Sequence, residues 1–258
     1  MFRHLLVVSF LFAASLRPLL AHDLWLKPEP DSSDSSALLI RAVLGTSFPK
    51  EEETMKASDY RNVRLHQKGA SEPIPDFAKE AKLLGRVTGN EAFFVSALRP
   101  AREIDLKQDE ARQYLSQEVG LDTAAIASLL ENAGRKIHET YSRSLKSLVV
   151  PPTASFVPQD VGFGWPLEIH LLRYERARDG RKSFAFRVSK DAKPLAGASV
   201  RVVGPDGKTL KARTDERGEA EASIVWGGPI LIAFIELAAS GPGRYETRWT
   251  NLAIYDLR

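Results

Sequence analysis

Apolar and polar side chains alternate with a period of two along much of the chain, which is typical of strands that bury one face. Residues 61–66 alternate in this way before a glycine turn, and residues 91–98 form another strand-like segment. Residues 38–44 are mostly apolar and end at Gly45, as expected for a more completely buried strand. These segments predict an N-terminal β domain over residues 22–104, built on a half-exposed antiparallel sheet.

The pattern becomes helical in the middle of the chain, over residues 105–150. Residues 108–119 predict a helix that ends at Gly120, and Asp122 is placed to cap a second helix over residues 124–130. A third helix is predicted from four apolar residues spaced like one helical face: Ile137, Tyr141, Leu145 and Leu148. Because this block lies within a β pattern, we interpret it as a helical insertion or connector.

Strand alternation returns after residue 160. Two segments place apolar side chains on one face: Phe184, Phe186 and Val188 in the first, and Ala220, Ala222, Ile224 and Trp226 in the second. Turn sequences at 204–207, 215–218 and 241–243 fall between short strands, as in an antiparallel sandwich. We therefore predict a β-sandwich over residues 160–258 that folds alone, with Trp226 in its core. The chain as a whole is predicted to be mainly β, with two antiparallel β-sandwich domains and a helical insertion between them.

The first 21 residues resemble a secretory signal peptide. Arg3 and His4 precede an apolar run of 12 residues, and Ala21 is a small residue at the expected cleavage point. The run is shorter than the roughly 20 residues that cross a bilayer as a helix, so we expect no permanent membrane span after cleavage. We expect the mature chain, residues 22–258, to be periplasmic or otherwise secreted.

Charge gives no indication of a nucleic-acid partner. The full chain carries 36 basic and 33 acidic residues, and the leader accounts for Arg3 and Arg17, so the exported chain is nearly neutral. Acidic and basic residues are mixed along the same stretches, and no long basic block occurs. We therefore expect no binding to nucleic acid.

Any metal ligands must be nitrogen or oxygen atoms, because the chain contains no cysteine. Cleavage would make His22 the first residue, whose α-amine and imidazole can close a chelate ring on one metal ion, with Asp23 beside it. Glu168 and His170 share one face of a predicted strand, a spacing that suits two ligands. Two plainer interpretations stay open: His22 is the end of a frayed strand, and His170 is hydrogen-bonded to Glu168 without metal.

The other histidines and the basic residues of the middle segment are predicted to be surface groups. His66 ends an alternating strand on its polar side, and His138 lies near a basic cluster, so both are expected to be solvated. Four basic residues are predicted to form a solvated helical face: Arg135, Lys136, Arg143 and Lys146.

Motifs of catalysis are absent from the sequence. It contains no nucleophile elbow, no His-Glu-x-x-His pair, no phosphate-binding loop and no dinucleotide fingerprint. No pair of neighbouring carboxylates lies in an apolar setting that would favour acid–base chemistry. We expect the protein not to be an enzyme.

Several motifs, in order along the chain, resemble one family. They are residues 21–26 (AHDLWL), 45–49 (GTSFP), 114–121, 141–148 (YSRSLKSL), 164–169 (GWPLEI), 193–200 and 214–218. Together they resemble the NikM-like periplasmic proteins, which contain a domain of unknown function associated with nickel and cobalt transport. The last two motifs also resemble a transthyretin-like or carboxypeptidase-regulatory-like sandwich, which implies Ig-like or prealbumin-like β domains and no particular activity.

The resemblance implies an exported accessory of transition-metal handling, with His22 as the position best suited to metal. The chain departs from the amino-terminal copper and nickel motif, because Leu24 stands where that motif has its third-residue histidine. The first hypothesis is therefore a metal-binding accessory that presents nickel, cobalt or copper to a membrane transporter. The alternative is a non-enzymatic structural or protein-interaction module that recognises an envelope protein.

Overall fold

The computed structural model describes residues 23–257, except residues 68, 75–81, 89–90, 132, 135, 155–156, 159 and 161. The predicted signal peptide, residues 1–21, and the predicted metal ligand His22 lie outside the described residues. Within the described part of the chain, no helix is both long enough and apolar enough to cross a membrane.

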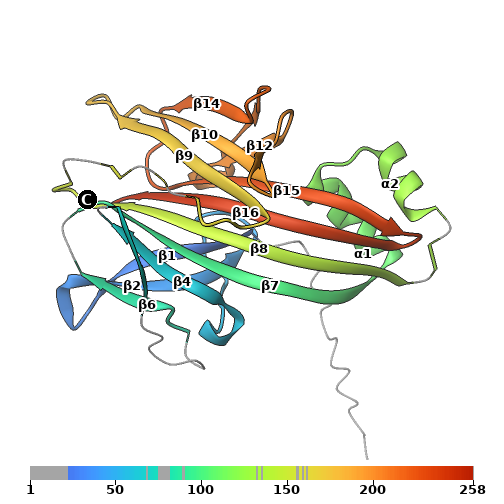
Figure 1. Ribbon diagram of the computed structural model, residues 1–258, viewed down its shortest axis with the longest axis horizontal. Coiled ribbons are helices and arrows are strands. Elements are labelled where there is room, and N and C mark those ends of the chain that lie inside the picture. The colour runs from blue at the N-terminus through green and yellow to red at the C-terminus, as the bar shows by residue number, and fades with distance from the viewer. Residues whose placement is uncertain are drawn as a thin grey trace, which may run out of the picture.

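An eight-stranded sheet runs through the middle of the molecule (Figure 1). Its strands, in spatial order, are β13 (Thr209–Arg213), β12 (Ser199–Val203), β15 (Ile230–Gly241), β16 (Arg244–Asp256), β8 (Lys136–Val150), β7 (Phe93–Lys107), β4 (Arg61–Gln67) and β5 (Ala70–Pro73). Neighbouring strands are antiparallel except β8 and β16, which pair in parallel along most of their length. We call it the long sheet.

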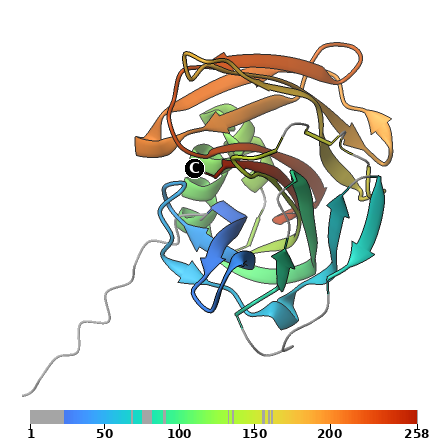
Figure 2. The same ribbon diagram turned by 90° about the vertical axis from the view of Figure 1, so that its left-hand side faces the viewer.

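Two four-stranded sheets lie on opposite sides of the long sheet, as the end-on view of Figure 2 shows. One contains β1 (Asp23–Asp31), β2 (Asp34–Gly45), β3 (Glu53–Thr54) and β6 (Gly85–Thr88). The other contains β9 (Leu167–Arg176), β10 (Lys182–Lys190), β11 (Lys193–Pro194) and β14 (Glu219–Ile224). The short 3-10 turns are η1 (Ala57–Asp59) and η3 (Pro205–Gly207).

The middle strands of the long sheet are buried on both faces, because each lies between two packed layers. Phe93 packs in the core that contains residues of β1 and β2, whereas its neighbour Phe94 packs in the core that contains residues of β9 and β10. Leu148 and Val149 of β8 divide between the same two cores. A strand buried on both sides needs a continuous apolar run, which the sequence provides at these positions.

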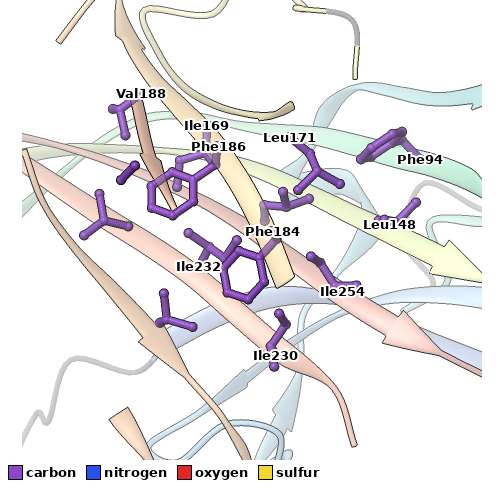
Figure 3. Close-up of a cluster of buried hydrophobic side chains, with 14 of the residues drawn as sticks. Phe94, Leu148, Ile169, Leu171, Phe184, Phe186, Val188, Ile230, Ile232 and Ile254 are labelled. Atoms are coloured by element: carbon purple, nitrogen blue, oxygen red, sulfur yellow. The ribbon is translucent and has the colours of Figure 1, made fainter. Parts of the chain in front are cut away.

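Aromatic and branched side chains fill the core between the long sheet and β9–β10. Figure 3 shows Phe184 and Phe186 of β10 among Ile232 and Ile254 of the long sheet. Each such side chain contributes about 1.5–3 kcal/mol when it leaves water. Trp226, which we predicted to lie in this core, is only partly buried against it.

Two of the three predicted helices are confirmed. Helix α1 (Gln108–Tyr114) continues into a π-helical turn, η2 (Leu115–Val119), and ends at Gly120, whose φ of 78° is left-handed. Helix α2 (Thr123–Leu130) is capped by Asp122, whose carboxylate accepts a 2.8 Å hydrogen bond from the Ala125 amide.

The third predicted helix is wrong, because residues 136–150 form strand β8. Ile137, Tyr141 and Leu145 are four residues apart, a spacing that places them on one side of a helix. Because four is an even number, the same spacing also places them on one face of a strand. Pairing decides between these readings: β8 lies between β7 and β16 in the long sheet.

The mainly β fold with a short helical insertion is confirmed. The expectation of purely antiparallel sheets missed the parallel pairing of β8 with β16. The long sheet takes strands from all three predicted segments, residues 22–104, 105–150 and 160–258. Independent folding of residues 160–258 stays a prediction.

Candidate functional site

Three charged side chains meet inside the molecule and form what we call the Lys146 cluster: Lys146, Asp160 and Glu168. Their side chains are only 2%, 0% and 3% exposed. Lys146 Nζ lies 3.0 and 3.1 Å from the two carboxylate oxygens of Asp160 and 2.8 Å from Oε1 of Glu168. Lys146 was predicted to be solvated, which is wrong because its segment is a central strand and not a surface helix.

Backbone groups hold the two acids in place. The Leu171 amide donates a 2.8 Å hydrogen bond to Oδ2 of Asp160, and the Phe163 amide donates one of the same length to Oε1 of Glu168. Lys146 also donates to the carbonyl oxygen of Ile169 at 2.9 Å. Burial raises the pKa of Asp160, and the neighbouring ammonium of Lys146 acts in the opposite direction.

An aromatic ring, Phe163, packs against the lysine of the Lys146 cluster. The ring centre of Phe163 lies 4.4 Å from Lys146 Nζ and 5.1 Å from the ring centre of Trp165. His66 also packs against Phe163, with 4.1 Å between the two ring centres. His66 was predicted to be exposed, but it is only 4% exposed, and Phe163, which precedes β9, packs against its ring.

The two histidines beside this cluster are held neutral. Nε2 of His66 lies 3.0 Å from the Ser96 hydroxyl, and Nε2 of His170 lies 2.7 Å from the Ser189 hydroxyl. Burial is the main cause that lowers the pKa of each imidazole to about 4, and the positive charge of Lys146 adds to it. A Cβ at Gly162 would lie 2.9 Å from Cε1 of His170, so a larger residue there would require the imidazole to shift.

The predicted ligands Glu168 and His170 do lie close together, with Nε2 of His170 3.9 Å from Oε2 of Glu168. Their nearest partners are other protein groups: Glu168 contacts Lys146, and His170 contacts Ser189. In the part of the chain that the structure describes, no three His, Cys, Asp or Glu side chains form a group able to hold a metal ion. Metal ligation by Glu168 and His170 therefore stays a prediction, and their present contacts do not favour it.

Asp23, at the start of β1, lies in a second, partly buried charged group, which we call the Asp23 cluster: Asp23, Glu118 and Arg201. Arg201 of β12 donates a 2.9 Å hydrogen bond to Oδ1 of Asp23, and its Nη2 lies 3.9 Å from Oε2 of Glu118. Burial raises the pKa of Glu118 to about 7, and the nearby charge of Asp23 acts in the same direction. Glu118 belongs to the π-helical turn, a distortion that occurs often at functional sites.

Buried arginines adjoin the Asp23 cluster. Arg143 of β8 stacks over the ring of Trp249 with 4.1 Å between the guanidinium carbon and the ring centre. Arg99, its cross-strand neighbour on β7, lies 5.6 Å from the ring centre of Tyr141. Arg143 was also predicted to be solvated, and this too is wrong, because β8 is covered on both faces.

Sequence reasoning missed the partners that define both clusters: Lys146, Asp160, Glu118 and Arg201. Lys146 alone carried a signal, since it lies between Leu145 and the apolar residues 148–150, in a segment that suits a buried strand. The other three come from separate elements, and no sequence spacing relates them.

A family model places the chain among known sequences. The model described as "Domain of unknown function (DUF4198)" matches residues 19–235. The chain belongs to this family. No curated protein matches this DUF4198 chain.

One solved structure aligns with the DUF4198 chain over 91% of its length, at 12% sequence identity and a TM-score of 0.25. It is described as "Structural insight into host cell surface retention of a 1.5-MDa bacterial ice-binding adhesin", and the DUF4198 chain covers 65% of that chain. So low a TM-score carries no argument about fold or function.

Proposed function

We propose that the protein is an exported, non-enzymatic transition-metal-binding accessory of the NikM-like type. Its metal would bind at the first residue of the mature chain, His22, which directly precedes Asp23 in the sequence. One observation carries this proposal: the first described strand begins at a buried carboxylate, Asp23, which shares one arginine with a second carboxylate, Glu118.

Charge and ligand chemistry support a cation at this position. Arg201 makes a close hydrogen bond to Asp23, but its contact with Glu118 is only 3.9 Å, and the Glu118 side chain is 15% exposed. A carboxylate taken out of water is stabilised by a nearby positive charge. A metal ion held by the amine and imidazole of His22 would supply that charge, with Asp23 or Glu118 as oxygen ligands.

Nickel, cobalt and copper are the metals that suit such a mixture of nitrogen and oxygen ligands. The proposed site is in the periplasm or another exported location, and the proposed partner is a membrane metal transporter.

The test is a comparison of two chains that differ only at the amino terminus. One begins at His22, and the other keeps Ala21 as an extra residue, which converts the α-amine of His22 into an amide. Titration calorimetry with copper(II) and nickel(II) salts should show at least about tenfold weaker binding for the extended chain, equivalent to ~1.4 kcal/mol. Equal affinities would contradict the proposal.

Two variants locate the site more sharply. Glu118→Gln preserves the shape of the side chain and removes its charge, so we expect weaker metal binding. His170→Ala should leave metal affinity unchanged, because His170 lies beside the Lys146 cluster and is not part of the Asp23 cluster. The intact mass of the exported protein should also correspond to a chain that begins at His22, because a different first residue would remove the chelate.

The second candidate function is an interaction module of the cell envelope. It is favoured by two hollows of about 670 and 520 Å3 that share Pro152, Arg176 and Asp256, with the exposed Leu172 lining the larger. Two results together would favour this function. Neither chain would bind metal, and the chain extended by Ala21 would bind its partner as well as the chain that begins at His22.

A further inference from the structure

The Lys146 cluster has the geometry of a reaction centre. Its amine and one carboxylate are in contact at 3.0 and 3.1 Å, a second carboxylate lies 2.8 Å from the same nitrogen, and all three side chains are almost fully buried. An ordinary buried ion pair needs one acid for one base, whereas here two acids surround one lysine.

We propose that Lys146 and Asp160 become joined by an intramolecular amide bond, an isopeptide cross-link, and that Glu168 is the catalytic acid–base group. This modification is independent of metal binding at His22 and gives Glu168 a role other than that of a metal ligand.

The reaction is a condensation that needs no cofactor. A proton passes from Lys146 Nζ to the Asp160 carboxylate, directly or through Glu168, and leaves a neutral amine and a carboxylic acid. The amine lone pair attacks Cγ of Asp160 and forms the new C–N bond. Glu168 then carries the second nitrogen proton to a hydroxyl of the tetrahedral intermediate, the C–O bond breaks, and one water molecule leaves.

The surroundings favour each of these steps. Contact between the two reacting groups replaces a bimolecular encounter by an intramolecular one, and such alignment gives a large advantage in rate. Burial raises the pKa of Asp160, which favours the protonated acid that the condensation requires. The three side chains are at most 3% exposed and the Phe163 ring lies against Lys146 Nζ, which limits access of water that would reverse the condensation.

Hydrogen bonds orient the reacting groups. The Ile169 carbonyl accepts from Lys146 Nζ, and the Leu171 amide donates to Asp160 Oδ2. An amide donor on that oxygen stabilises the negative charge that develops on it when the amine attacks. The Phe163 amide holds the Glu168 oxygen that faces the lysine. Each of the three groups therefore has its own anchor on the backbone.

Intact-mass spectrometry of the denatured mature chain tests the proposal directly. Formation of one isopeptide bond makes the chain lighter by about 18 Da, the mass of one water. Trypsin does not cut after an acylated lysine, and the sequence has no lysine or arginine between Lys146 and Arg173. We therefore expect a single tryptic peptide over residues 144–173, lighter by about 18 Da. The full unmodified mass, with cleavage after Lys146, would overturn the proposal.

Three variants separate this cross-link from other losses of water. Lys146→Gln should have its full sequence mass, and a loss of water that persists there would place the dehydration elsewhere and overturn the proposal. Asp160→Asn should lose ammonia, about 17 Da, and so give the same product mass as the authentic chain. Glu168→Gln should keep its full mass over the same period, and an equal rate of water loss would contradict the role of Glu168.

Discussion

His66 couples the protonation of one side chain to the stability of the fold. Its imidazole is buried against Phe163 and hydrogen-bonded to Ser96, and the positive charges of Arg64 and Lys146 act on it. The native state therefore holds it neutral, with a pKa of about 4, whereas a free histidine has a pKa near 6.5. Protonation has to be accommodated by unfolding or by rearrangement of this contact.

The sign of the pH dependence follows from these two values. Between about pH 6.5 and 4 the unfolded chain binds a proton that the native chain does not, so stability falls as the pH falls. We expect His66→Gln, which can still reach Ser96, to lose less stability than the native protein between pH 7 and 4.5, by roughly 1–2 kcal/mol. Denaturant unfolding at both pH values measures this difference.

A matched control is His138→Gln, at a histidine whose side chain is 51% exposed. That change should leave the pH dependence of stability close to that of the native protein. Identical pH slopes for the His66 variant and the native chain would contradict the prediction.

Residue type alone misplaced three basic side chains. Arg143, Lys146 and His66 were expected in solvent because such groups are rarely buried without partners. Each has partners that sequence cannot reveal: a tryptophan face, two carboxylates, and a serine hydroxyl with a phenyl ring. These partners come from distant parts of the chain, and only folding brings them together.

At the scale of elements, turns and caps were predictable and β8 was not. Gly120 ends one helix and Asp122 caps the next through contacts with residues close to them in the sequence, so the local sequence is enough to predict both. The identity of β8 depends on pairing with β7 and β16, which lie elsewhere in the sequence. A spacing of four residues fits both structures, and long-range pairing decides between them.

Alanine substitutions at two glycines with positive φ, Gly180 and Gly218, distinguish the stability cost of backbone strain from that of steric contact. Gly180 has a φ of +83°, and an added Cβ would meet nothing within 4 Å. Gly218 has a φ of +71°, and its Cβ would lie 2.7 Å from the Val188 carbonyl oxygen and 2.8 Å from the Leu195 amide nitrogen. Gly180→Ala should cost roughly 1–2 kcal/mol from the left-handed backbone alone.

Gly218→Ala should cost more, by about 1–3 kcal/mol beyond Gly180→Ala, because the backbone of β10 and its turn must also move. Denaturant unfolding of the two single variants measures the difference. Equal losses of stability would mean that the backbone near Gly218 moves away from the added Cβ without a cost in the free energy of unfolding.

At the scale of the whole molecule, the long sheet unites segments that the sequence pattern separates. Composition and alternation indicated β structure before and after residues 105–150, and the natural prediction was two sandwiches with a connector. The connector instead contributes β8, a central strand. The Lys146 cluster has the same origin, since Lys146 comes from β8 and Glu168 from β9 in another sheet. Alternation singled out Glu168 but could not supply its partner.

This arrangement predicts that residues 160–258 will not fold alone, contrary to the expectation from the sequence pattern. Without residues 136–150, β16 loses its parallel partner and presents an unpaired edge, which destabilises a sheet and promotes aggregation. The core around Phe184 loses Phe94 and Leu148. Asp160 and Glu168 lose Lys146, which leaves two carboxylates without their cation.

We therefore expect the segment 160–258, expressed by itself, to show no cooperative thermal transition, while the mature chain under the same conditions shows one. Circular dichroism during heating measures both. Adding residues 134–159 restores β8 and the lysine, so the longer segment should regain strand signal relative to the shorter one. A sharp transition of the short segment close to that of the mature chain would show that the C-terminal strands form an independent domain, and that the long sheet joins two units already stable on their own.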